Sequence, residues 1–248
     1  MSNQSYHSHS SKFRKTVAKC KKVSQKFANI PSVTPQRFYG SVLFTRLCVI
    51  AISMERLLPT KITDHWDYAS VASLTRNILE CYLIFFYFCI DSVSYTEWEC
   101  RYNIFNLHDC TRRKKLFESE ILGDCDQDIQ GFNKQISELK DRLINNEYFN
   151  NNLSDKQKKD YLKGNKHLLL SQDEVIEKMG LSLDNFRFSY IFLSNQIHTL
   201  PMNFYRMGEQ IRGTGVHSDV EEDYTQMCVD ITIKYLEKAI NDMENLFG

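Results

Sequence analysis

The stretch that decides the fold is LDNFRFSYIFLSNQIHTLP, from Leu183 to Pro201. Its polar residues Tyr190, Ser194 and His198 are each four positions apart, so on an α-helix they form one line along one face. Large apolar side chains surround this line, which predicts that it is at least partly buried. Buried phenol, hydroxyl and imidazole groups need hydrogen-bond partners. We therefore expect this helix to pack against another helix that carries polar side chains.

Outward from this stretch, apolar residues recur at helical spacing along most of the chain. The 248 residues include only 9 Gly and 4 Pro, too few for the many tight turns of a sandwich or a barrel. The sequence predicts an all-α fold, a bundle-like domain of about eight or nine helices at residues 31–248. A segment at 145–165, rich in Asn and Lys, could be an insertion. Residues 1–30 form a basic N-terminal arm, without regular structure over the first eleven and then helical.

The charge of the chain is unevenly distributed. Net charge is zero, yet no acidic residue precedes Glu55. Such asymmetry can mark a contact with a nucleic acid or with a membrane, and here we consider RNA or a nucleotide as the partner. The alternative is that the basic arm packs on the acidic remainder, within one molecule or across a homodimer. The basic residues before Glu55 are Lys12, Arg14, Lys15, Lys19, Lys21, Lys22, Lys26, Arg37 and Arg46.

The eight cysteines contain no C-x-x-C pair, and most lie in apolar helical patterns. A reduced cysteine there acts as a small hydrophobe, so we expect a cytoplasmic protein. The most apolar run, Ile78 to Ile90, is shorter than the roughly 20 residues that cross a bilayer and contains Glu80. It predicts a buried core helix and no membrane partner. No pattern such as H-E-x-x-H occurs, so neither a metal nor a cofactor is expected.

Arg76 and Glu80 lie four positions apart in that apolar helix, TRNILECYLIFF. Burying charges there is costly unless they are paired. One interpretation is that they pair with each other or lie at the edge of the apolar face. In the functional interpretation, they face the line of Tyr190, Ser194 and His198. Glu80 would then accept a hydrogen bond from His198 and raise the basicity of its imidazole.

Arg101 and His108 form a second candidate pair, with the spacing R-x6-H. Seven positions are almost two helical turns, so both side chains project from one face. A base that takes the ribose 2′-OH proton and a cation beside the phosphate can cleave RNA without a metal. The alternative is that Arg101 simply pairs with Glu97.

These residues resemble two families. Arg76-x-x-x-Glu80 followed by Tyr190-x-x-x-Ser194-x-x-x-His198 resembles an uncharacterised, mainly bacterial, all-helical domain-of-unknown-function family, over about Ile52 to Phe247. That resemblance implies a helical fold and a shared polar cluster, without a settled activity.

The R-x6-H spacing is more loosely similar to the HEPN superfamily. Its members are often RNA-cleaving toxins or defence proteins that work as dimers, which would make Arg101 and His108 the catalytic pair. HEPN motifs usually have a polar residue after the Arg, whereas Tyr102 stands here.

Two hypotheses follow. In the first, the protein acts on RNA or a nucleotide as a metal-independent ribonuclease, toxin or defence-type protein. Its catalytic residues would be Glu80, Arg101, His108 and His198, and its binding residues Arg76, Tyr190 and Ser194. In the second, it is a non-enzymatic helical scaffold or dimerisation module whose polar cluster holds the core in register.

Overall fold

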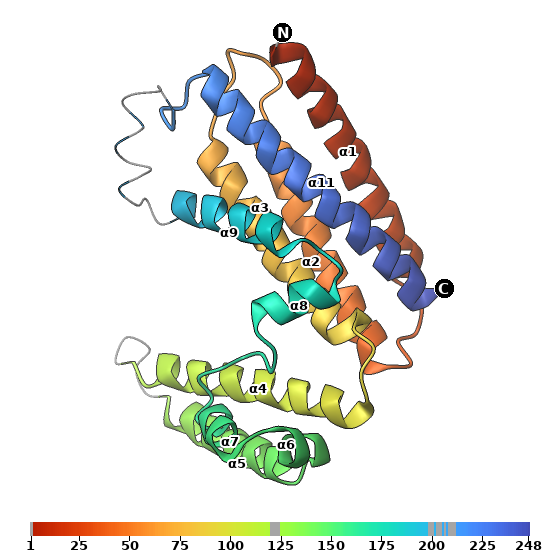
Figure 1. Cartoon of the computed structure of the whole chain (residues 1–248), viewed down its shortest axis with the longest axis vertical. Coiled ribbons are helices and arrows are strands. Elements are labelled where there is room, and N and C mark those ends of the chain that lie inside the picture. The colour runs from red at the N-terminus through yellow and green to blue at the C-terminus, as the bar shows by residue number, and fades with distance from the viewer. Residues whose placement is uncertain (1, 120–124, 198–200, 202–204, 206, 208–211) are drawn as a thin grey trace. The chain divides into compact units, whose positions relative to one another are not determined.

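The computed structural model describes residues 2–119, 125–197, 201, 205, 207 and 212–248. Over these residues the chain forms ten α-helices and one short π-helix, and its only β-type pairing is the isolated bridge between Trp66 and Gly215 (Figure 1). The predicted all-α class is therefore confirmed. The chain divides into two compact units: residues 1–90 with 175–248, and residues 91–174.

The first unit is built from long helices that begin and end at recognisable residues. They are α1 (Ser2–Phe27), α2 (Pro35–Leu57), α3 (Tyr68–Phe85) with the π-helix η1 (Phe86–Ile90), α9 (Leu183–Ile197) and α11 (Asp219–Phe247). Helix α2 starts where the Thr34 side chain accepts a hydrogen bond from the Arg37 N–H, with Pro35 in its first turn. The Asp67 side chain caps α3 in the same way.

Helices α1 and α11 pack side by side along their length, and α2 and α3 complete the bundle (Figure 1). The apolar stripe of α1 that faces this core includes Phe13, Val17 and Cys20, each at most 1% exposed. On α11 the matching residues include Cys228, Leu236 and Ile240, all fully buried. The basic N-terminal segment is therefore an integral helix of the first unit.

Helix α1 begins at Ser2, although the sequence predicted no regular structure for the first eleven residues. The reason is long-range contact. The Tyr6 hydroxyl donates to the Pro59 carbonyl oxygen at 3.0 Å, and the Tyr6 ring lies 5.1 Å from the Trp66 ring. His9 Nδ1 lies 2.5 Å from Asp230 Oδ1. These contacts hold a polar segment that local composition alone would leave unfolded.

The second unit consists of α4 (Tyr95–Phe117), α5 (Asp126–Ile144), α6 (Glu147–Asn152) and α7 (Asp155–Leu162), and α8 (Gln172–Lys178) crosses its boundary. The Ser94 side chain caps α4 by accepting from the Glu97 N–H at 3.2 Å. Its core gathers Leu107, Leu143 and Phe149, each at most 1% exposed. Residues 145–165, considered above as an insertion, supply α6 and α7 to this core.

Two helical segments, Pro35–Leu57 and Tyr68–Ile90, are long and apolar enough to cross a bilayer by length and composition. The core helices of a globular protein have the same properties. In the second segment, 56% of the most apolar window is buried within the protein, with Leu79, Tyr82 and Phe85 at most 1% exposed.

Candidate functional site

The line of polar residues on α9 faces the charged pair on α3, both in the first unit. Arg76 donates from Nε to Glu80 Oε1 at 2.9 Å, from Nη1 to Ser194 Oγ at 2.7 Å and from Nη2 to the Tyr190 hydroxyl at 2.8 Å. Four of the five residues proposed for this cluster therefore meet in one network, which we call the α3/α9 cluster: Arg76, Glu80, Tyr190 and Ser194.

The acceptors of Arg76 are themselves held in place. The Tyr190 hydroxyl donates to Glu80 Oε1 at 3.3 Å, and Ser194 Oγ donates to the Tyr190 carbonyl oxygen at 2.5 Å. The guanidinium carbon of Arg76 also lies 4.4 Å from the centre of the Tyr190 ring. The Phe186 ring supports that phenol from the previous turn, at 5.5 Å. The side chains of the cluster are thus oriented by one another, an arrangement that favours a preorganised binding site.

Exposure differs sharply between the two charged groups. The Arg76 side chain is 16% exposed and the Glu80 side chain 44%. A guanidinium has five N–H donors, and three of the Arg76 donors are used by described residues. The remaining N–H groups can bind an anionic oxygen, and the accessible carboxylate beside them can accept a proton. This combination of groups suits phosphate chemistry.

His198, the third member of the predicted line on α9, lies outside the described residues. Its predicted hydrogen bond to Glu80 stays a prediction. Within the described residues, Glu80 accepts from Arg76 and Tyr190 instead.

The Arg101 and His108 pair lies on α4, in the second unit. Arg101 is fully buried and donates to Glu97 Oε1, from Nη2 at 2.5 Å and from Nε at 3.0 Å, and to Asp91 Oδ2 at 2.8 Å. His108 Nδ1 lies 3.1 Å from the Gly164 carbonyl oxygen, and its ring lies 5.3 Å from the His167 ring. The Arg101–Glu97 pairing weighed as an alternative is present, and the guanidinium sits between two carboxylates.

A buried acidic pair at the start of α11 was not singled out from the sequence. Glu221 is fully buried, and its two carboxylate oxygens accept from the backbone N–H groups of Tyr68, at 2.7 Å, and Gly213, at 2.9 Å. Burial raises the pKa of Glu221 despite these bonds. Glu222 is 1% exposed and accepts from His217 Nε2 at 2.9 Å. The sequence pattern at this position is Ser218-x-x-Glu221, which by itself indicates an N-terminal helix cap and not a buried carboxylate.

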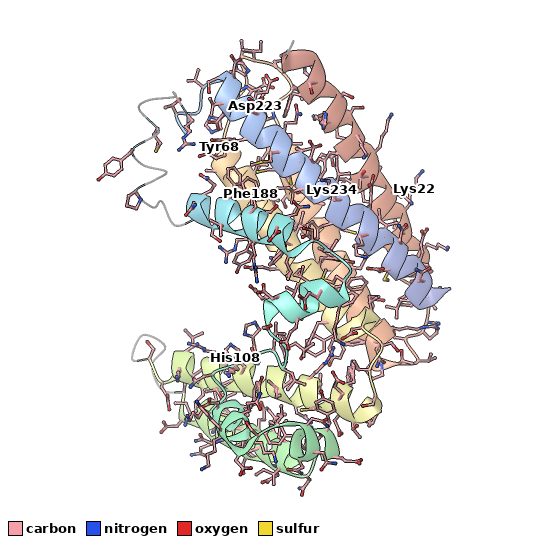
Figure 2. All side chains as sticks on the ribbon, in the orientation of Figure 1. Lys22, Tyr68, His108, Phe188, Asp223 and Lys234 are labelled. Carbon is pink, nitrogen blue, oxygen red and sulfur yellow. The ribbon has the colours of Figure 1, made fainter. Side chains whose placement is uncertain are left out.

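The charged side chains of α1 all lie on its solvent-exposed side. Its seven Lys and Arg residues are exposed, and the helix contains no acidic residue (Figure 2 labels Lys22). Lys12 lies 3.5 Å from Glu237 of α11. The other six make no ion pair with the described part of the chain. We call these six the α1 basic face: Arg14, Lys15, Lys19, Lys21, Lys22 and Lys26.

The chain belongs to the family of unknown function DUF5677, whose model matches residues 37–213. The match includes α3 and α9, and so all four residues of the α3/α9 cluster. Membership of an uncharacterised domain-of-unknown-function family, expected from the sequence, is confirmed. No curated protein and no solved structure matches the chain.

Proposed function

We propose that this protein binds RNA through the α1 basic face and acts on RNA or a nucleotide at the α3/α9 cluster. The observation that carries the proposal is the set of six exposed cations on one helix without a carboxylate partner among the described residues. Such a stripe attracts a polyanion, and each phosphate contact releases counterions. The eight free thiols support placing the protein in a reducing cytoplasm.

The chemistry proposed for the cluster is metal-independent cleavage of the ribose–phosphate backbone. Glu80 takes the proton of a 2′-OH, the oxygen attacks phosphorus, and the 5′-oxygen leaves with a proton to give a 2′,3′-cyclic phosphate. The remaining N–H groups of Arg76 stabilise the charge on the phosphate oxygens. His198, one helical turn beyond Ser194 in the sequence, is proposed to protonate the leaving oxygen.

The HEPN-like alternative places this chemistry at Arg101 and His108. We favour the α3/α9 cluster because Arg76 is 16% exposed whereas Arg101 is fully buried between Asp91 and Glu97. A guanidinium neutralised by two carboxylates would have to leave both before it could bind a phosphate.

Gel-shift titration with single-stranded RNA tests the binding step. We expect a complex at about 50 mM salt that weakens steeply by about 200 mM. Replacing Lys15, Lys19 and Lys22 with Ala should lower the affinity and the salt dependence. The matched control replaces three exposed lysines of the second unit, Lys134, Lys156 and Lys159. No complex at the lower salt concentration, or equal loss in both triple variants, would remove the proposal.

Cleavage of the same RNA tests the catalytic step, with Glu80→Gln, His198→Ala and His108→Ala compared. The proposal requires the first two to lose activity while His108→Ala keeps it. The opposite pattern would transfer the chemistry to α4. Circular dichroism at matched concentration verifies that each variant is folded.

A second candidate function, a dimerising scaffold, has its own supporting observation. One face of α2 exposes Phe38, Val42 and Val49, at 54%, 53% and 47%. These residues are spaced by four and seven positions and so lie on one side of the helix. Light scattering on the native chain and on a Phe38→Ser, Val42→Ser variant tests whether this face joins two copies. If the protein is such a scaffold and its polar cluster only holds the core in register, His198→Ala should lower the melting temperature without affecting any activity.

A further inference from the structure

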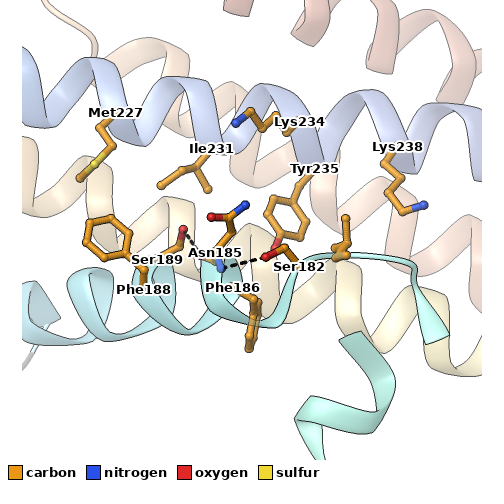
Figure 3. A pocket seen from close by; sticks show the side chains of 11 residues that line it. Ser182, Asn185, Phe186, Phe188, Ser189, Met227, Ile231, Lys234, Tyr235 and Lys238 are labelled. Atoms are coloured by element: carbon orange, nitrogen blue, oxygen red, sulfur yellow. Dashed lines mark hydrogen bonds between the residues drawn. The ribbon is translucent and has the colours of Figure 1, made fainter. Parts of the chain in front are cut away.

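A groove separate from the α3/α9 cluster lies between α9 and α11, with a cavity volume of about 300 Å³ (Figure 3). Its walls come from Leu181 to Ser189 on one side and Met227 to Lys238 on the other, all within the first unit. This volume is at the lower end of the range for small-molecule sites, so the groove suits one compact ligand.

One part of the groove is apolar and aromatic. Phe188 projects from α9 opposite Met227 and Ile231 of α11 (Figure 3). The Phe188 side chain is 63% exposed, so its ring face is open to a ligand. A flat heterocycle can stack on such a ring in the way that bases stack on aromatic side chains of proteins that bind single strands.

The middle of the groove is polar. Asn185 and the Tyr235 hydroxyl face it from α9 and α11 (Figure 3), and neither side chain makes a hydrogen bond with the described residues. Burial raises the pKa of Tyr235 to about 12, so its hydroxyl keeps its proton and can donate. The Tyr235 ring packs against the Tyr82 ring in a T-shaped arrangement, with the ring centres 5.7 Å apart. A hydrocarbon chain would leave these groups unpaired, whereas a base or a sugar would satisfy them.

Two lysines of α11, Lys234 and Lys238, complete the lining. They are one helical turn apart and form no ion pair within the described part of the chain. The acidic neighbour between them, Glu237, lies toward Lys12 at 3.5 Å. The groove therefore has a cationic edge without a resident anion, which attracts a phosphate.

From this combination we propose that the α9/α11 groove is a binding site for a nucleoside 5′-monophosphate. The base stacks on Phe188, Asn185 and Tyr235 hydrogen-bond the base and sugar, and Lys234 and Lys238 hold the phosphate. The proposal does not depend on RNA binding by the α1 basic face, because the two surfaces share no residue.

Isothermal titration calorimetry at low salt with each of the four nucleoside 5′-monophosphates tests the proposal, with adenosine, inorganic phosphate and decanoate as further probes. We expect at least one monophosphate to bind more tightly than adenosine or phosphate alone. The double variant Lys234→Ala, Lys238→Ala should weaken monophosphate binding roughly tenfold and leave adenosine binding unchanged. Phe188→Ala should weaken the binding of the monophosphate and of adenosine, each by roughly tenfold.

Matched controls separate this site from its surroundings. Ile191→Ala removes another exposed apolar side chain of α9, at 61%, that does not line the groove. Lys19→Ala with Lys22→Ala removes two cations of α1. Both control variants should bind the monophosphate with the affinity of the native chain, even if the α1 variant no longer binds RNA. Absence of monophosphate binding at millimolar concentration, unchanged affinity in the groove variants, or binding of decanoate alone would overturn the proposal.

Discussion

Nη1 of Arg76 donates a hydrogen bond to the Ser194 hydroxyl at 2.7 Å across 118 positions of sequence. The same guanidinium binds Glu80 one turn along α3 and the phenol of Tyr190 one turn before Ser194 on α9. One side chain thus joins two helices and sets their register. Any catalytic use of the α3/α9 cluster begins from this fixed geometry.

Replacing Ser194 with Ala should lower the free energy of unfolding by about 1.5–3 kcal/mol, since one hydrogen bond to a charged donor is lost. Arg76→Lys should cost more, because an ammonium cannot make three divergent bonds in the plane of a guanidinium. The double variant should lose less than the sum of the two, which urea denaturation can measure as a coupling energy. Strict additivity would mean that the two side chains do not interact in solution.

Arg101 in the second unit should behave as a structural residue. Arg101→Met leaves Asp91 and Glu97 without their cation in a setting where their side chains are 10% and 15% exposed. We expect a loss of about 3–5 kcal/mol in unfolding free energy. The control, Arg113→Met, breaks an exposed 3.8 Å pair with Asp109 and should cost less than about 1 kcal/mol. Similar costs for both would contradict the burial of Arg101.

Gly164 lies just after α7 and has a φ of +70°, and two features of this position oppose a side chain. A Cβ there would meet the Thr111 hydroxyl, and L side chains rarely adopt this φ. Gly164→Ala should destabilise the protein by more than about 1 kcal/mol. Gly131→Ala is the control, because that helical position has nothing within 4 Å of an added Cβ, and it should stabilise the protein by roughly 0.5–1 kcal/mol. Thermal melts distinguish the two.

The buried carboxyl group of Glu221 should make the free energy of unfolding depend on pH. Its pKa in the folded chain is raised from 4.5 by burial, so the folded state holds this proton more tightly than the unfolded chain does. The resulting contribution to stability is fully present below pH 4.5 and is lost as the pH rises through the folded-state pKa. Glu221→Gln should therefore make the slope of unfolding free energy against pH more positive above pH 4.5. Urea denaturation across this range measures the slope, and an unchanged slope would refute the assignment.

Local patterns predicted the helical class of the fold and the contact between the polar residues of α3 and α9. Arg76 meets Tyr190 and Ser194 because four-residue spacing determines which side chains share a face. Periodicity says nothing about residues outside helices. Asp91, the second partner of Arg101, lies between η1 and α4, so sequence reasoning found only Glu97.

Where the structure differs further from what local sequence patterns predict, tertiary contacts are the reason. The Ser218-x-x-Glu221 pattern predicts a reciprocal cap, and Ser218 does accept from the Glu221 N–H at 3.2 Å. The Glu221 carboxylate, however, binds Tyr68 and Gly213 instead, 153 and 8 positions away. The division into two units likewise depends on which helices pack together.

The pairing of α1 with α11 has a consequence for biosynthesis. On the ribosome, α1 emerges long before its packing partner at Asp219–Phe247 has been translated. Until then the apolar stripe at Phe13, Val17 and Cys20 lacks the surface that α11 provides, and only α2 is available to pack against α1. Completion of the first unit therefore waits until α11 has been synthesised, and a chaperone that shields nascent helices would act in that interval.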